Sequence, residues 1–164
     1  MKFADVKAGL NRALQTLYPI SSEDPKVKTY GYYGIEIDEG YDTPCFFTKL
    51  ETGESRVSNK NTLHHHVIFY INYFPDVVDE IDILQKVDAI RELFAIGCPI
   101  KDTNNDRYIE CTGYDWDFGG TRKNMLEISV DFEYFTSLYK PPTAELMKDA
   151  QIIFNGGTQD EWNA

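Results

Sequence analysis

The chain has 164 residues, of which 14% are aromatic, and a formal net charge of −11. This length suits one domain with one core, and so acidic a chain lacks the clustered Lys and Arg with which proteins bind nucleic-acid phosphates. No apolar run approaches the roughly 20 residues of a membrane span, and three cysteines without a CxxC pair favour reduced thiols over a disulfide framework.

The N-terminal segment is predicted to be an amphipathic helix. Its apolar residues recur at three- and four-residue steps and stop before Pro19: Phe3, Val6, Leu10, Leu14 and Leu17. This start is charged and helical in pattern, and it lacks the apolar run of a secretion signal. We therefore expect the protein to remain in the cytoplasm of the cell that makes it until it is assembled.

Three predicted strands follow. Residues 29–37 are rich in Tyr and Ile, residues 45–50 come after a turn signal at 38–40, and residues 64–74 show the strongest strand pattern. Apolar side chains occupy both faces of the third segment, so we expect that strand to be covered on both sides. Between the second and third strands, residues 51–61 are polar and carry both charge signs, which predicts a long, exposed hairpin tip.

A second amphipathic helix is predicted from the break at Pro75 to about Ala95, with a stop at Gly97. Acidic residues at its start complement the positive end of the helix dipole. Its expected buried stripe consists of Ile81, Leu84, Val87, Ile90 and Phe94. A turn cluster at residues 103–106 then leads into a second block of strands.

In this block, residues 108–112 form a predicted strand, after which aromatic residues alternate with acids up to residue 118. The last strand, residues 126–134, alternates cleanly: one face is apolar, and the other carries Glu127, Ser129, Asp131 and Glu133. One of these faces must lie on the core, and the other must meet water or a partner. After Pro141, residues 143–154 predict a short helix, and residues 155–164 predict a loose tail.

The order of these elements is helix, strands, helix, strands. Such blocks predict an α+β fold, with a mostly antiparallel sheet and two amphipathic helices packed on it. We expect a single domain over residues 1–140 and a C-terminal extension over residues 141–164.

No constellation of residues indicates an enzyme. His64 and His66 share one face of a strand, but a zinc site needs three or four ligands, and no HExxH motif or Cys pair supplies the others. Cys45 is interpreted as a small buried residue. The last two strands carry acidic residues two positions apart, as on the solvent-facing side of an ordinary strand, and this does not indicate a catalytic acid–base pair: Asp115, Asp117, Asp131 and Glu133. We therefore predict no catalytic residue, metal or cofactor.

Two motifs together resemble a known family. Residues 40–50 read GYDTPCFFTKL, and residues 70–75 read YINYFP and close a strand just before an amphipathic helix. In this order and spacing they are similar to the phage tail terminator family of tailed phages and Gram-positive prophages, over roughly residues 3–136. The segment after Pro141 is longer than the family leads us to expect.

The resemblance implies a structural virion protein without catalytic residues. Its subunits would assemble in the cytoplasm of the bacterial host into a ring, commonly a hexamer, that caps the finished tail tube and ends its growth. The implied partners are other copies of the chain, the tail tube protein and the head–tail connector proteins. DNA would pass through the lumen of the ring without specific binding, and no membrane is involved.

Two groups of residues are candidates for surfaces of such a ring. Glu127, Asp131 and Glu133 are predicted to face the lumen, where their charge repels DNA phosphates. The charged residues of the hairpin tip are predicted to contact the ring or the tube: Glu51, Glu54, Arg56 and Lys60.

Three other interpretations stay open. A head–tail connector or stopper would also be a ring-forming protein without catalytic residues, and its position in the particle would distinguish it. A small metal-dependent hydrolase would use His64, His66 and nearby carboxylates, and a stoichiometric metal assay would detect it. An acidic DNA mimic would need acids spaced like phosphates over one face, whereas the acids here are interleaved with Lys and Arg.

Overall fold

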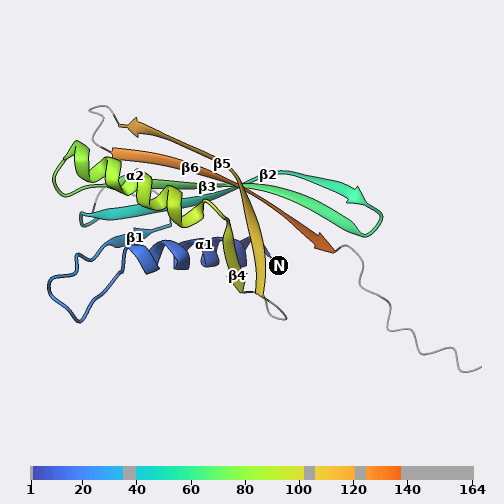
Figure 1. The fold of residues 1–164 in the computed structure, drawn as a ribbon, viewed down its shortest axis with the longest axis horizontal. Coiled ribbons are helices and arrows are strands. Elements are labelled where there is room, and N and C mark those ends of the chain that lie inside the picture. Colours follow the sequence, from blue (N-terminus) through green and yellow to red (C-terminus); the bar gives the residue numbers. More distant parts are fainter. Residues whose placement is uncertain (1, 35–39, 102–105, 121–124, 138–164) are drawn as a thin grey trace, which may run out of the picture.

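The computed structural model describes residues 2–34, 40–101, 106–120 and 125–137, which form two helices and six strands. In chain order these are α1 (Phe3–Leu17), β1 (Gly31–Tyr33), β2 (Cys45–Asn59), β3 (Thr62–Phe74), α2 (Glu80–Phe94), β4 (Cys98–Lys101), β5 (Asp106–Gly119) and β6 (Met125–Ser137). The sheet has the order β1-β2-β3-β6-β5-β4, in which β1 pairs with β2 in parallel and all other neighbours are antiparallel. This architecture confirms the predicted α+β fold (Figure 1).

Some predicted features lie outside the described residues. They are the C-terminal extension at 141–164, the end of the first predicted strand at 35–37 with most of the following turn, and most of the turn cluster at 103–106. Among the helices that are described, none is both long and apolar enough to cross a membrane.

Both helices pack against the same face of the sheet. Every second residue of β3 from Val67 to Tyr73 is fully buried in one core with the apolar stripes of α1 and α2. The alternate residues of β3, such as Ile68 and Tyr70, are only half-buried. The expectation that this strand is covered on both sides is therefore wrong, because both helices pack against the same side of the sheet. We call the uncovered side, formed by the outward side chains of β2, β3, β6 and β5, the helix-free face.

The buried stripe of α2 differs from the prediction in two of its residues. Val87, Ile90 and Phe94 are buried as expected, and α1 is apolar on one face as predicted. Ile81 and Leu84, in contrast, are 66% and 38% exposed. The reason is that α2 carries aliphatic residues on two faces, and only the face that begins at Ile83 meets the sheet.

Strand β2 continues through most of the segment that was predicted to be a hairpin tip. Ser55, Arg56 and Val57 pair with β3, so only Lys60 and Asn61 form the turn between Asn59 and Thr62. Polarity misled the prediction here, because a polar segment forms a ladder as readily as an apolar one when both its faces meet water. The result is a β2–β3 arm that projects beyond the helices (Figure 1), and β6 pairs with β3 along the whole of it. Among the described residues of the strand predicted at 29–37, residues 31–33 pair with β2.

A glycine allows the tight connection from α2 to β4. Gly97 has a φ of +102°, its N–H donates to the carbonyl of Phe94 at 2.8 Å, and a Cβ at this position would lie 2.2 Å from the carbonyl oxygen of Ile109. Gly97→Ala is expected to lower the free energy of unfolding by about 3 kcal/mol or more, because the strain of a positive φ is added to the clash of the new Cβ with the backbone.

Gly40→Ala is the matched control for this change. Gly40 also has a positive φ, of +88°, but a Cβ there would have nothing within 4 Å. Gly40→Ala is therefore expected to lower the free energy of unfolding by about 1–2 kcal/mol, through the strain of the positive φ alone. Urea denaturation of both variants measures the difference, and equal costs would contradict the clash.

A lysine is buried among tyrosines where α2 meets the rest of the core. Lys86 is 6% exposed, and its Nζ lies 5.0–5.6 Å from the ring centroids of Tyr18, Tyr30 and Tyr73. The ammonium donates to Asp82 Oδ1 at 2.8 Å, and the Tyr73 hydroxyl donates to Asp82 Oδ2 at 3.2 Å. Burial, and then the Asp82 charge, raise the pKa of Tyr73, so its hydroxyl remains a donor. The group thereby joins α2 to β3, the end of α1 and the segment before β1.

Candidate functional site

The acidic residues predicted from the last strand lie together on the helix-free face. Glu127 is exposed, and Asp131 and Glu133 are half-buried, whereas their neighbours along β6 point into the core. Pairing between strands extends this row sideways, since Glu133 lies opposite Glu110 of β5, and Glu127 lies opposite Asp117. The fold thus gathers carboxylates from two strands on one face of the sheet.

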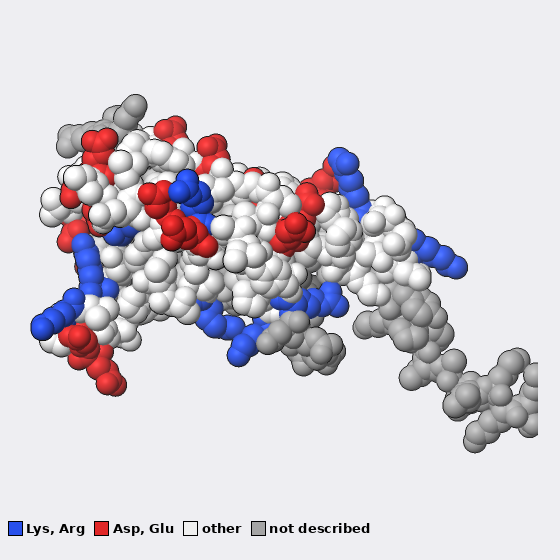
Figure 2. Space-filling model, in the orientation of Figure 1, with Lys and Arg blue, Asp and Glu red and all other residues white. Residues whose placement is uncertain are grey.

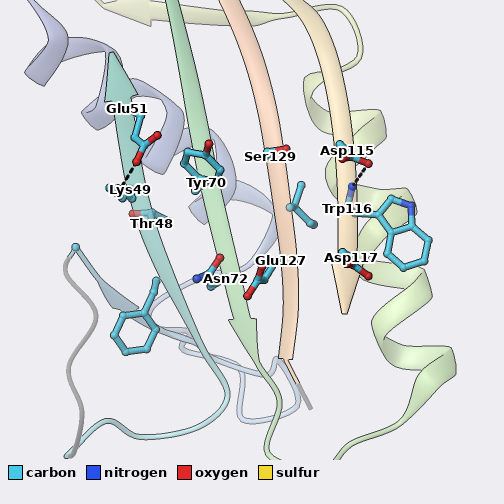
Figure 3. Close-up of a pocket in the computed structure, with 13 residues that line it drawn as sticks. Thr48, Lys49, Glu51, Tyr70, Asn72, Asp115, Trp116, Asp117, Glu127 and Ser129 are labelled. Carbon is cyan, nitrogen blue, oxygen red and sulfur yellow. Dashed lines mark hydrogen bonds and ion pairs between the residues drawn. The ribbon is translucent and has the colours of Figure 1, made fainter. Parts of the chain in front are cut away.

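One end of the helix-free face is hollowed into a groove of about 590 Å³ (Figure 3). Carboxylates outnumber cations among the charged side chains that line it: Lys49, Glu51, Asp115, Asp117 and Glu127. The single ammonium group among them is already paired with Glu51. Such a groove disfavours phosphate groups, and in the part of the chain that the structure describes no cluster of three or more His, Cys, Asp and Glu is arranged to hold a metal ion.

Two histidines lie opposite these acids, which was not foreseen. His64 Nε2 is 3.1 Å from Glu133 Oε2, and His66 Nε2 is 3.1 Å from Asp131 Oδ1. The two histidines share one face of β3, as predicted, but their acidic partners are 65 or more positions away and are set by the register between β3 and β6. Only that register could have revealed the pairs.

His65 points to the opposite side and is buried there. Its ring nitrogens lie 2.8 Å from Ser55 Oγ and 2.7 Å from Thr136 Oγ1, and its ring stacks on Tyr134. Burial lowers the pKa of His65, and the neighbouring charges of His64 and the N-terminal amine lower it further. His65 is therefore neutral in the folded protein down to a lower pH than in the unfolded chain.

This burial predicts that acid destabilises the protein partly through His65. In the unfolded chain His65 takes up a proton near pH 6.5, whereas in the folded protein it does so only at a lower pH. The folded state therefore loses no stability through His65 above pH 6.5, and it loses stability as the pH falls from there towards the lowered pKa. His65→Gln keeps hydrogen-bonding groups but cannot titrate. Urea midpoints measured from about pH 8 to about pH 5 should fall less steeply for this variant than for the wild type. Parallel profiles would contradict the role of His65.

The charged residues of the predicted hairpin tip lie along the β2–β3 arm. Glu54, Arg56 and Lys60 are exposed, Glu51 is half-buried, and Arg56 forms an ion pair with Glu54. Exposed pairs of this kind contribute little to stability, typically below about 1 kcal/mol. The arm therefore presents a surface with both charge signs at little cost to the fold.

The cysteines have the environment of packed side chains. Cys45 and Cys98 are buried, and burial raises the pKa of each thiol to about 11; for Cys45 the charge of Asp42 adds to the effect. Both thiols are therefore protonated at neutral pH, and a thiol is a weak nucleophile. This agrees with the interpretation of Cys45 as a small buried residue.

Comparison with known proteins identifies a family model that covers most of the chain. A family model described as "Phage tail terminator protein" matches residues 5–144. No curated protein matches the chain. One similar solved chain, from a structure titled "Virion of native gene transfer agent (GTA) particle", has 12% identity and a TM-score of 0.47 over 80% of this chain and 94% of that one. Another, titled with an identifier alone, has 8% identity and a TM-score of 0.45 over 86% and 99%.

Proposed function

The chain belongs to the phage tail terminator protein family, and we propose that it caps the tail tube, ends its growth and presents the surface that joins the tail to the head. The family match over residues 5–144 carries this proposal, because it covers both helices and all six described strands. The family assigns the chain a structural role in the virion tail. Assembly in the host cytoplasm is part of the proposal.

We infer that the working form is a ring, most simply a hexamer, of this chain. Its other partners would be the tail tube protein below it and the head–tail connector proteins above it. The position of Glu127, Asp131 and Glu133 on one face supports their assignment to the lumen, since carboxylates there would repel DNA and let it slide. On the face visible in Figure 2, both acidic and basic side chains form small separate groups, and most of the surface carries neither.

Tails assembled with and without the chain test the capping role. Negative-stain microscopy should show tails of uncontrolled length that fail to join heads when the chain is absent. Tails of normal length that merely fail to join heads would instead assign the chain to the connector. Intact infectious particles would refute both roles.

We propose that the β2–β3 arm contacts the tube or the neighbouring subunit through Glu51, Glu54, Arg56 and Lys60. The arm can be shortened without changing its register, by replacing residues 57–63 with Asn-Gly between the paired residues Arg56 and His64. The shortened chain should keep its thermal unfolding transition, because the removed residues lie outside the core, yet lose control of tail length. Tails of wild-type length from the folded variant would refute a contact through the tip of the arm, which includes Lys60.

A further inference from the structure

Strands β2 and β5, on either side of the middle pair β3 and β6, each have a long stretch with no partner strand on the outer side. Strand β1 covers β2 only along residues 45–47, and β4 covers β5 only along residues 106–109. Among the described residues, no strand follows the outer side of residues 48–59 or of residues 110–119. We call these two stretches the β2 edge and the β5 edge. Such edges present backbone N–H and C=O groups with which a further strand can pair.

Both edges carry features that hinder indiscriminate pairing. The ladder between β2 and β3 shifts its register twice within the β2 edge. On the β5 edge, the amide of Trp116 donates to Asp115 Oδ1 at 2.9 Å. In the same way, the amide of Phe118 donates to Asp117 Oδ1 at 2.7 Å. Natural sheets use bulges and charged side chains to reject unspecific partners, so a strand that pairs here must match these edges.

Charge distinguishes the two edges and indicates which strand each one fits. The β5 edge carries three acids and no cation, whereas the charges of the β2 edge balance, with two cations and two acids. Two β5 edges paired with each other would bring both sets of acids together, and like charges on paired strands are destabilising. The β5 edge therefore fits a strand with cations, and Lys49 and Arg56 of the β2 edge supply them. Figure 3 shows Lys49 on the first of four neighbouring strands, and Asp115 and Asp117 on the last.

The strand directions also suit a joint between copies. The four strands in the order β2-β3-β6-β5 alternate in direction, so β2 and β5 run oppositely. If the β5 edge of one copy lies beside the β2 edge of the next, with both sheets facing the same way, the two strands are antiparallel, as within the group. Asp117 is level with Phe47 across the sheet, and β1 covers Phe47. The next copy must therefore be shifted along the strands, and a closed sheet requires such a stagger.

We propose that the β5 edge of one copy pairs with the β2 edge of the next, and that this pairing joins the neighbouring subunits of the ring into one continuous sheet. The inference rests on the proposed function and names the strands through which its subunits meet. Contacts between two different surfaces of the same chain run head to tail and close into rings. Both helices lie on one face of the sheet, and their bulk fits the wider, outer side of a ring. The helix-free face then turns inwards, in agreement with the lumen proposed for Glu127, Asp131 and Glu133.

Cysteine crosslinking in assembled tails tests the pairing. Glu54→Cys and Asp115→Cys, at exposed positions near the middle of the two edges, are combined in a Cys111→Ser chain, since Cys45 and Cys98 are buried. A short, flexible bismaleimide tolerates small differences in register. The double variant should give a ladder of dimers and higher oligomers, each single variant should stay monomeric, and a mixture of the two single variants should give dimers only.

The matched control combines Glu54→Cys with Glu23→Cys, an exposed acid on the loop after α1 and outside both edges, and should give no ladder. Dimers from Asp115→Cys alone would overturn the proposal, because they indicate that two β5 edges meet. Monomers from the double variant, in tails of controlled length and with both cysteines open to a fluorescent maleimide, would also overturn it while leaving the terminator role intact. A ladder, together with normal tails in the absence of the chain, would support the pairing and refute the terminator role.

Amide hydrogen exchange of the unmodified chain tests the pairing without any substitution. Peptides that cover residues 52–59 and 110–119 should exchange about tenfold more slowly in assembled tails than in the free chain, because new backbone hydrogen bonds protect their amides. Unchanged exchange at both edges would overturn the proposal. Protection of the β5 edge without the β2 edge would overturn it as well, because a strand of another protein would then occupy β5.

Discussion

Particles that carry Glu127→Lys, Asp131→Lys and Glu133→Lys are expected to have tails of normal length but to release their DNA about tenfold more slowly or worse. The three side chains share the helix-free face, and the changes leave the core untouched. If this face lines the lumen, each subunit would place three ammonium groups against passing phosphates. Lysine–phosphate contacts release counterions, so raising the salt concentration should restore much of the rate of release.

The control variant carries the same change in charge elsewhere, as Glu23→Lys, Asp24→Lys and Glu92→Lys. These residues are exposed and lie on the loop after α1 and on α2, away from the helix-free face. DNA release from the control should match the wild type. Salt-independent, wild-type release from the first variant, with normal tails, would show that the helix-free face does not line the lumen. Stability must be compared too, because Asp131 and Glu133 accept hydrogen bonds from β3.

The elements that could be predicted from the sequence are those in which one face is buried and the other is not. Helix α1 and strand β6 have a clean apolar stripe, so periodicity located both elements and most of their buried residues, although Phe3 and Leu17 at the ends of α1 are exposed. The outer part of β2 was not predicted to be a strand, because a hydropathy pattern reports burial and not backbone pairing, and both faces of this part meet water. Likewise, Ile81 and Leu84 were assigned to the core because aliphatic residues on two faces of α2 leave the buried face undetermined.

That error concerns aliphatic residues that the fold leaves exposed on α2. A helix with more apolar surface than its core requires presents the remainder to solvent or to a partner. Other parts of the candidate site depend on pairing between distant segments. The row that joins His66 to Asp131, and the pairing of Glu110 with Glu133, exist only because β3, β5 and β6 are neighbours in this register. A single sequence holds no signal of that register.

Asp82→Asn is expected to be the most destabilising change of a partly exposed residue, with a loss of about 3 kcal/mol in the free energy of unfolding. Asp82 is the anionic partner of Lys86, whose side chain is 7% exposed among three tyrosine rings. Without the carboxylate, a buried ammonium keeps only the attraction of the rings, which contributes roughly 0.5–2 kcal/mol. Asp82 also lies in the first turn of α2, where the helix dipole favours a negative charge.

Two comparisons separate the buried charge from other causes. Asp88→Asn removes a similar ion pair from the same helix, to Arg91 at 2.8 Å, but both partners are more than half exposed, so the loss should stay below about 1 kcal/mol. Lys86→Met removes the cation and leaves Asp82, which water reaches, so about 1–2 kcal/mol is expected. Urea denaturation of the three variants gives the order. If Lys86→Met costs as much as Asp82→Asn, the contact of the ammonium with the tyrosines, rather than the ion pair, holds α2 against α1 and β3.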